Sequence, residues 1–229
     1  MSDLSILMPA YNEEATIDEA IERLFGAELP VSDVELIVVD DGSTDRTAEV
    51  LAAREQGDGV RVIRHESNRG KGAAIRTALA EAGGTYTAIL DADLEYDPRD
   101  LGRLLDPLLS GRAGAVFGTR AFEAHSSYGF WYVLGNKGVT LAANVLYNSW
   151  LSDIMTCWKT MPTELLRSLP LRESGFGIEP EIAARLLRSG ETIYEVPVTY
   201  NARRREQGKK LQARDGVKVL GTLLRCRFD

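Results

Sequence analysis

The chain has 229 residues, of which 44% are hydrophobic and 27% charged, and these proportions predict one globular domain spanning residues 1–229. The formal net charge of −7 argues against a nucleic-acid-binding protein, because such proteins usually carry a basic face. Two cysteines are too few for a disulfide framework or a zinc site. We find no signal peptide and no run of the roughly 18 apolar residues that a membrane helix needs, so we expect a cytoplasmic protein.

The first half of the chain alternates between short β-rich runs and longer helical patterns. The predicted strands are residues 5–8, 35–39, 60–64, 85–90 and 115–118, and the predicted helices are residues 13–25, 45–55, 70–82 and 98–109. This alternation is typical of an α/β fold whose mostly parallel sheet has helices on both faces. Ligands of such sheets bind beyond the carboxyl ends of the strands, so we expect the site at that edge.

The pattern changes after Arg120. In chain order we predict a polar loop at 123–129, a helix at 136–151, a loop leading into a strand at 152–159, a helix at 179–188, a strand at 192–200 and an amphipathic helix at 215–225. No repeat or long linker separates these elements from the first half. We therefore expect them to belong to the same domain.

Acidic residues follow the fourth predicted strand as Asp91-Ala92-Asp93. Alternate side chains of an extended segment share a face, so the two carboxylates should point the same way. Two such groups repel one another unless a cation joins them. Mg²⁺ and Mn²⁺ favour oxygen ligands of this kind and fill their remaining positions with phosphates and water. The segment therefore predicts a divalent metal site at Asp91 and Asp93, with a solvated turn as the alternative.

Four motifs occur in order along the first half. They read MPAYNEE at 8–14, VVDDGS at 38–43, NRGKGAA at 68–74 and LDAD at 90–93. Together they resemble the family 2 glycosyltransferases, which have the GT-A fold. The resemblance implies that about residues 1–120 bind a UDP- or GDP-hexose and that Mg²⁺ or Mn²⁺ is the cofactor.

The resemblance also implies which residues bind the donor: Pro9, Tyr11, Glu13, Asp40, Lys71, Asp91, Ala92 and Arg120. Tyr11 and Asp40 should lie at the base and ribose, although a packed core aromatic remains the alternative for Tyr11. The neighbouring Asp41 is as well explained by turn and cap chemistry. Lys71 lies between glycines at the start of a predicted helix, a position suited to an anionic group.

About residues 121–229 form the predicted acceptor-binding half, which resembles that of the dolichyl- and polyprenyl-phosphate sugar synthases and their bacterial relatives. The motifs are GTR at 118–120, SDIMTCWK at 152–159, GFGIEPE at 175–181 and EVPVTY at 195–200, followed by Arg203 and GKK at 208–210. The resemblance implies that Arg120 and Arg203 neutralise the acceptor phosphate and the donor pyrophosphate, a role that the two-pronged guanidinium suits. The sequence departs from the mannosyl synthases at Glu95, where they usually carry glutamine. No second arginine occurs near Asn136-Lys137.

We expect inversion at the anomeric carbon by one displacement, with a metal at Asp91 and Asp93, and Arg203, stabilising the departing nucleoside diphosphate. A lipid phosphate acceptor is already anionic and needs no strong base, whereas a hydroxyl acceptor needs one. Asp153 is the candidate base, and bracing of its loop is an equally open interpretation.

The sequence has three rival interpretations. A glycosyltransferase acting on a hydroxyl of a saccharide or small metabolite remains open, as does a sugar-nucleotide-binding protein without turnover. A nucleotidyltransferase is disfavoured because residues 9–14 lack the glycine-rich, arginine-containing loop of that class.

Aromatic residues gather between positions 128 and 150, and the predicted helix 215–225 mixes leucines with basic residues. Both segments are candidates for docking on the cytoplasmic face of a membrane, where a lipid acceptor would lie. Packing in the core is the alternative for these side chains. A separate membrane subunit would be another route to a lipid acceptor.

Overall fold

The computed structural model describes residues 3–55, 59–120, 130–203 and 213–229. Its strands form one sheet in the order β3-β2-β1-β4-β6-β5-β7. The strands are β1 (Leu4–Ala10), β2 (Val34–Asp40), β3 (Val60–Arg64), β4 (Tyr86–Ile89), β5 (Ala115–Thr119), β6 (Lys159–Pro162) and β7 (Ile193–Pro197). Only β6 runs antiparallel to its neighbours, β4 and β5. The predicted mostly parallel α/β sheet is confirmed.

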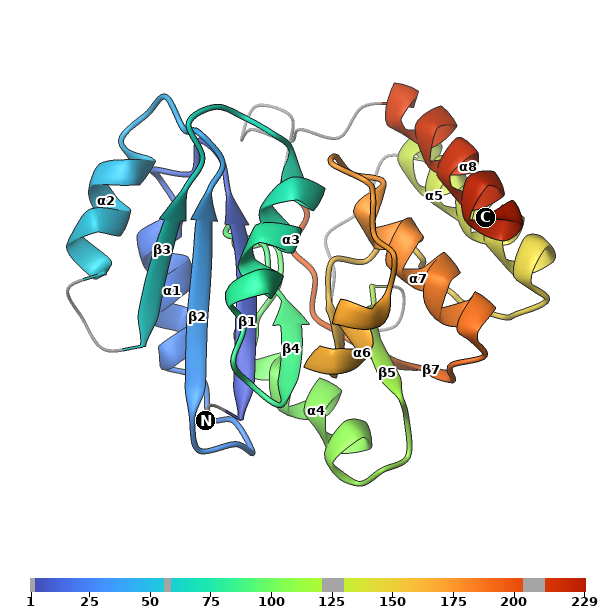
Figure 1. The fold of residues 1–229 in the computed structure, drawn as a ribbon, viewed down its shortest axis with the longest axis horizontal. Coiled ribbons are helices and arrows are strands. Elements are labelled where there is room, and N and C mark those ends of the chain that lie inside the picture. The colour runs from blue at the N-terminus through green and yellow to red at the C-terminus, as the bar shows by residue number, and fades with distance from the viewer. Residues whose placement is uncertain (1–2, 56–58, 121–129, 204–212) are drawn as a thin grey trace.

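Helices flank this sheet and extend beyond its β7 end (Figure 1). They are α1 (Ile17–Phe25), α2 (Thr47–Arg54), α3 (Lys71–Glu81), α4 (Leu101–Leu109) after the 3₁₀ turn η1 (Pro98–Asp100), α5 (Phe130–Tyr147), α6 (Thr163–Ser168), α7 (Ile178–Ser189) and α8 (Ala213–Phe228). Figure 1 shows α3 in front of the strands and α1 behind them, while α5 and α8 lie side by side at the far end from α2.

The core forms where the central strands meet the helices. Nearly every residue of β1 is buried, as expected of a parallel strand that is covered on both faces. Helix α1 buries Ile17, Ile21 and Leu24, which recur at helical spacing on one stripe, and exposes the charged positions between them. This stripe fixes the helix against the sheet and so sets the direction of the preceding loop.

The direction of β6 matters for the site. Because β6 is antiparallel, it begins at the edge where β1, β2 and β4 end. The segment that leads into β6, residues 152–158, therefore reaches the same edge as the loops that follow the parallel strands. One reversed strand brings the second half of the chain to the ligand-binding edge of the first.

Several predicted boundaries in the second half were wrong. The predicted loop leading into a strand at 152–159 has its strand later than expected, because β6 begins at Lys159 and runs to Pro162, and the short helix α6 that follows was not predicted. Elements of four and six residues are too short to show a period. Helix α5 begins at Phe130, six residues before its predicted start, because its first three residues are all aromatic and show no helical periodicity. The predicted loop 123–129 lies outside the described residues.

Helices α5 and α8 carry exposed apolar side chains. On α5 they include Leu141 and Val145, which are 59% and 74% exposed, and on α8 they include Leu224 and Phe228 at 48% and 81%. Trp150, just after α5, is 84% exposed. These side chains are not core residues, so the alternative of core packing fails for them, whereas it holds for Val219 and Leu223 of α8, which are buried. None of the described helices combines the length and the apolar character required to cross a bilayer.

Candidate active site

A cavity of about 370 Å³ opens at the carboxyl edge of the sheet. Nine of the eleven predicted site residues line it: Pro9, Tyr11, Glu13, Lys71, Asp91, Ala92, Asp93, Arg120 and Arg203. Asp40 and Asp153 do not. The motifs that are scattered along the sequence thus converge on one space.

Asp91 lies on one wall of this cavity, paired with a lysine. The Nζ atom of Lys71 is 2.7 Å from Oδ2 of Asp91 and 2.5 Å from Oε1 of Glu179. Burial alone would lower the pKa of Lys71, but the attraction of Asp91 and Glu179 outweighs it and raises that pKa well above its ordinary value. Lys71 is therefore a fixed positive charge at the first position of α3.

The start of α3 has this shape because of a glycine. Gly70 has a φ of +94°, and a Cβ on it would lie 2.3 Å from the carbonyl oxygen of Ser174. Only glycine tolerates both the conformation and this close approach. The contact packs the segment before α7 against the start of α3, and so brings Lys71 and Glu179 together.

Asp93 is paired with an arginine from the second half of the chain. Arg203 donates from Nη2 to Oε2 of Glu13 over 2.8 Å and from Nε to the carbonyl oxygen of Asp93 over 2.7 Å. Its Nη2 is also 3.9 Å from the Asp93 carboxylate. The guanidinium therefore bridges the loop after β1 and the loop after β4.

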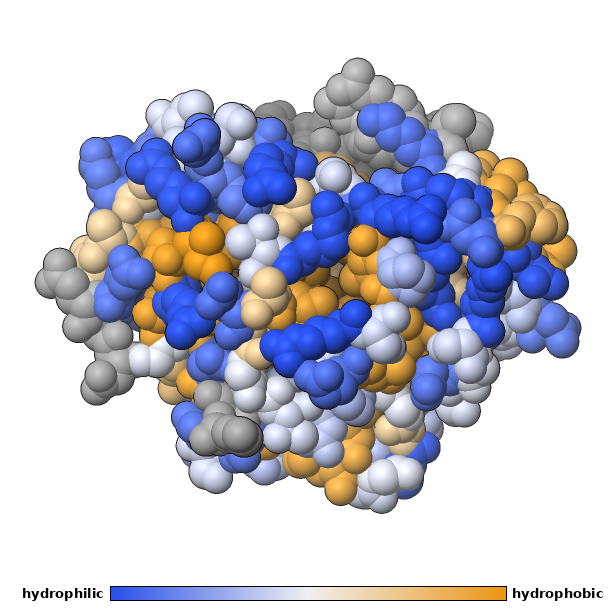
Figure 2. Space-filling view, in the orientation of Figure 1, coloured by the Kyte–Doolittle hydropathy of each residue, from blue (hydrophilic) through white to orange (hydrophobic). Residues whose placement is uncertain are grey.

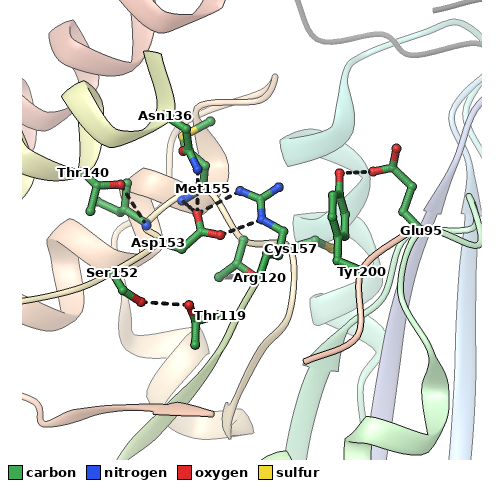
Figure 3. Close-up of polar contacts among 12 residues, drawn as sticks. Glu95, Thr119, Arg120, Asn136, Thr140, Ser152, Asp153, Met155, Cys157 and Tyr200 are labelled. Atoms are coloured by element: carbon green, nitrogen blue, oxygen red, sulfur yellow. Dashed lines mark hydrogen bonds and ion pairs between the residues drawn. The ribbon is translucent and has the colours of Figure 1, made fainter. Parts of the chain in front are cut away.

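Glu95 positions the segment that carries Arg203. One of its oxygens accepts the backbone N–H of Arg203 over 2.7 Å, and the other accepts the hydroxyl of Tyr200 (Figure 3). The departure from glutamine at this position thus has a structural role, because a carboxylate can accept both bonds. Leu94, between Asp93 and Glu95, has a left-handed backbone with φ of 61°, an uncommon conformation that turns the chain sharply here.

The two adjacent aspartates after β2 have different surroundings. Asp40 is buried, accepts the backbone N–H of Ser43 over 2.9 Å and pairs with Arg64 at 3.3 Å, away from the cavity. Asp41 lines the cavity and accepts the backbone N–H groups of Arg69 and Gly70 over 2.9 and 2.7 Å. These two bonds reach across to the loop before α3, whereas the local turn bond considered for Asp41 is made by Asp40, to Ser43. The ribose-binding role of Asp40 stays a prediction, and this geometry does not favour it.

Arg120 and Asp153 form a buried, two-bond ion pair (Figure 3). The Nε and Nη2 atoms of Arg120 lie 2.6 and 2.8 Å from the two oxygens of Asp153, and Asn136 donates to the same carboxylate over 3.1 Å. Burial alone would raise the pKa of Asp153, but Arg120 and Asn136 outweigh it and hold the pKa below its ordinary value. The guanidinium also lies 5.0 Å from the centre of the Tyr200 ring.

This arrangement places Arg120, rather than Asp153, at the cavity. Asp153 is 4% exposed and stands behind the arginine as its counter-charge. A carboxylate with a lowered pKa is also a weak proton acceptor. The role of Asp153 as a base stays a prediction that the geometry does not favour, while the bracing interpretation has direct contacts to support it. Lys137 donates to the carbonyl oxygen of Ser152 over 3.1 Å.

Sequence reasoning missed part of the cavity wall. Tyr96 accepts the backbone N–H of Cys157 over 3.1 Å through its hydroxyl, and both residues line the cavity beside Phe176. Cys157 and Phe176 lie inside motifs quoted for the second half, so their position was a usable signal. No sequence signal pointed to Tyr96, since a tyrosine that follows a buried strand is usually a core residue.

The acidic pair suits a metal that shares its ligands with a substrate. Among the described residues, no group of three or more histidine, cysteine, aspartate or glutamate side chains could hold a metal by itself. Asp91 and Asp93 nevertheless face one cavity with about a fifth of each side chain exposed. Mg²⁺ and Mn²⁺ commonly bind to one or two carboxylates and complete their shell with phosphates and water. The donor set therefore fits such an ion.

Comparison with known proteins supplies independent findings. The model of glycosyl transferase family 2 matches residues 5–169. A dolichol-phosphate mannosyltransferase of Pyrococcus furiosus is 28% identical over 210 residues, which are 90% of this chain and 58% of that protein. An undecaprenyl-phosphate 4-deoxy-4-formamido-L-arabinose transferase of Pseudomonas aeruginosa is 36% identical over 131 residues, 56% of this chain and 38% of that protein. The chain thus spans 58% of the length of the first relative and 38% of the length of the second.

Among solved structures, glucosyl-3-phosphoglycerate synthase of Mycobacterium tuberculosis superposes with a TM-score of 0.76 at 25% identity. The match covers 99% of this chain and 79% of that one. That structure contains Mn²⁺, uridine diphosphate and phosphoglyceric acid. Another structure of the same enzyme contains Mg²⁺ and uridine diphosphate, with a TM-score of 0.75 at 26% identity.

Proposed function

Because the chain belongs to glycosyl transferase family 2, we propose that it transfers a hexose from a UDP- or GDP-sugar to a polyprenyl phosphate, with inversion at the anomeric carbon. One observation carries the proposal. A single cavity brings together two acidic side chains that suit a metal and two arginines, Arg120 and Arg203, that suit phosphates. The relatives named for dolichol phosphate and undecaprenyl phosphate support the acceptor class.

In this proposal the first-half residues bind the donor. Tyr11 and Pro9 offer ring and backbone surface to the base, and Glu13 lies beside them with a carboxylate for ribose hydroxyls. Asp91 and Asp93 would hold Mg²⁺ or Mn²⁺, which when bound neutralises charge on the pyrophosphate oxygens. Arg203 already bridges the two donor loops, and turning its guanidinium toward the pyrophosphate would stabilise the leaving nucleoside diphosphate.

Arg120 is the proposed acceptor-binding group. It is held rigidly by Asp153 at the cavity wall, so little side-chain freedom is lost when an anionic oxygen binds. A lipid phosphate needs no general base, which agrees with the weak basicity of Asp153. The transfer then needs only position and charge neutralisation.

The exposed apolar side chains of α5 and α8 support a peripheral site on the cytoplasmic face of a membrane. They lie on two adjacent helices, and α8 ends with Arg227, which suits anionic headgroups, while Arg225 is paired with Glu173. Figure 2 shows an apolar patch at the α8 end of the visible face. A polyprenyl chain could thus stay in the bilayer while its phosphate enters the cavity, with or without a separate membrane subunit.

A second acceptor class has a specific observation in its favour. The mycobacterial enzyme, whose structure overlays nearly the whole chain, was solved with phosphoglyceric acid. A small phosphorylated metabolite would also place its phosphate at Arg120, but its reacting hydroxyl would have to lose a proton to a base. This alternative therefore predicts a catalytic need for a carboxylate, with Asp153 as the sequence-based candidate.

The test incubates the protein with Mn²⁺ or Mg²⁺, candidate UDP- and GDP-hexoses and a short polyprenyl phosphate, and measures released nucleoside diphosphate and labelled lipid. We expect metal-dependent labelled lipid that is lost in Asp91→Ala and retained in Asp106→Asn, a control on the exposed face of α4. Release of nucleoside diphosphate only when phosphoglyceric acid is added would favour the second class. No donor binding and no turnover would refute the glycosyltransferase activity.

A further inference from the structure

Lys159, the first residue of β6, is a buried cation that the site described so far does not use. It is 1% exposed and does not line the cavity. Its Nζ atom donates to the carbonyl oxygen of Ile154 over 3.3 Å and to that of Thr156, and lies 4.5 Å from the centre of the Phe117 ring. No carboxylate of the described residues forms an ion pair with it. A buried cation without a counter-ion is costly, so the groups around it must gain from its presence.

The ammonium holds the backbone of the turn that leads into β6. Ile154 and Thr156 are fully buried, so without Lys159 their carbonyl oxygens would lose water and gain no donor in return. The N–H group of Cys157, in the same turn, donates to the hydroxyl of Tyr96 over 3.1 Å. Lys159 thus holds the turn by its carbonyl groups, and Tyr96 holds it by an N–H group.

This turn carries side chains to the proposed acceptor side of the cavity. Met155 and Cys157 line the cavity, and Asp153, just before the first carbonyl that Lys159 binds, holds Arg120 by two bonds (Figure 3). A shift of the turn would therefore move the counter-charge of the arginine that we assign to the acceptor phosphate.

The ammonium also adds a positive charge behind this wall of the cavity. The titratable groups that act on it are Asp153 and Cys157 of the turn, Glu179 of α7 and Lys71 of α3. Burial lowers the pKa of Lys159 to about 8, because the attraction of the acidic groups offsets only part of the lost hydration. Burial raises the pKa of the Cys157 thiol, and the contacts described above outweigh burial to lower the pKa of Asp153 and raise that of Lys71. A change near pH 8 therefore reports on Lys159 rather than on these three groups.

We propose that Lys159 is a positioning residue of the acceptor site, whose ammonium holds the turn 154–157 so that Asp153 keeps Arg120 directed at the acceptor phosphate. This inference rests on the proposed function. The protonated ammonium makes charge-assisted bonds to the two carbonyls, and such bonds are roughly twice as strong as neutral ones. The neutral amine still has N–H donors but holds the turn more weakly. Acceptor use should therefore fall as the folded protein loses this proton, although the fold itself becomes more stable because the unfolded chain retains the proton to higher pH.

The first experiment needs no variant. With Mg²⁺ and saturating donor, the KM for a short polyprenyl phosphate is measured from about pH 7 to about pH 9.5, beside the affinity for the nucleoside diphosphate and the free energy of unfolding in urea. We expect the acceptor KM to rise roughly threefold to tenfold across pH 8, while diphosphate affinity stays within about twofold and stability increases. A flat acceptor KM, or an equal loss of diphosphate affinity, would overturn the inference, because a purely structural lysine would not weaken acceptor use as the fold gains stability.

The second experiment assigns the pH dependence to Lys159. In Lys159→Met we expect an acceptor KM that is roughly tenfold higher than in wild type at pH 7 and no longer changes across pH 8. Lys159→Arg stays charged over the whole range and can donate to both carbonyls, so its acceptor KM should lie within about threefold of wild type and be equally flat. A normal KM in Lys159→Met at pH 7 would overturn the inference. So would a pH dependence that survives in either variant, since another group would then be titrating.

Thr160→Val is the matched control on the same strand. It alters the next residue without changing its shape, and removes a buried hydroxyl that has no hydrogen-bond partner among the described residues. We expect the wild-type acceptor KM and the wild-type pH dependence. Loss of that dependence in the control would mean that any disturbance of β6 abolishes it, which would refute the assignment to Lys159. Wild-type protein that binds no nucleotide, or transfers no sugar to polyprenyl phosphate at pH 7, would instead refute the proposed function, and this inference with it.

Discussion

The pair formed by Arg120 and Asp153 allows bracing to be separated from base catalysis. In Asp153→Ala the arginine loses both of its short bonds to the carboxylate while its own side chain stays about 10% exposed. Removing one partner of a buried ion pair costs about 3–5 kcal/mol of unfolding free energy, because the other charge remains buried without compensation. Asp153→Asn keeps one acceptor oxygen, so we expect roughly half of that loss.

Urea unfolding followed by circular dichroism measures these losses. The pH dependence supplies a second signature, since the folded-state pKa of Asp153 is lowered. The contribution of the pair should be fully present above the ordinary aspartate pKa of about 3.9 and be lost as pH falls through the lower folded-state value. The difference between wild type and Asp153→Asn should therefore shrink in acid.

Kinetics decide between the two roles. Bracing predicts that Asp153→Asn weakens acceptor binding through a displaced Arg120 and leaves the pH profile of turnover unchanged. A general base predicts a loss of roughly 10²-fold or more in turnover. Unfolding free energies of both variants within 0.5 kcal/mol of wild type, or a rate loss of that size with normal stability, would refute the bracing argument.

Three further outcomes follow from the same geometry. Gly70→Ala should destabilise the protein and weaken nucleotide binding together, because a Cβ there meets the Ser174 carbonyl; a normal melting temperature would contradict this. Asp91→Asn should abolish detectable Mn²⁺ binding in the presence of nucleoside diphosphate, measured by electron paramagnetic resonance, whereas retained binding would move the metal elsewhere. Burial lowers the pKa of Lys159 from its ordinary value of 10.5 to about 8 in the folded protein. Between these two pH values the unfolded chain therefore binds more protons than the folded chain. Wild-type stability relative to Lys159→Met should therefore rise by about 1.4 kcal/mol per pH unit in this window, and a flat difference in urea unfolding would refute it.

The resemblance to family 2 glycosyltransferases and the α/β fold predicted from the sequence are both confirmed. Periodicity was reliable where an element was long or buried, as in α1 and β1, because burial on one stripe or both faces leaves a clear pattern. It failed at β6 and α6, where tertiary pairing rather than local pattern sets the structure. Periodicity also could not predict the strand order, since an antiparallel strand and a parallel strand have the same local pattern.

The motifs quoted from the sequence converge on one cavity, whereas the position of single side chains within it could not be predicted as closely. Asp40 and Asp41 are adjacent, and neighbouring residues at the end of a strand point in opposite directions, so a one-residue difference decides which reaches the cavity. The same limit applies to Asp153, whose task depends on a partner 33 positions away.

The reversed strand β6 also means that the two halves of the chain are interleaved rather than joined end to end. Strand β5 belongs to the first half by sequence, yet its neighbours in the sheet are β6 and β7, both from the second. A fragment ending at residue 120 would leave β5 without a partner and expose an unpaired edge on β4, which invites aggregation. A chimera built to change the proposed acceptor site must therefore exchange β5, β6 and β7 as a unit, together with part of the sheet that supports the proposed donor site.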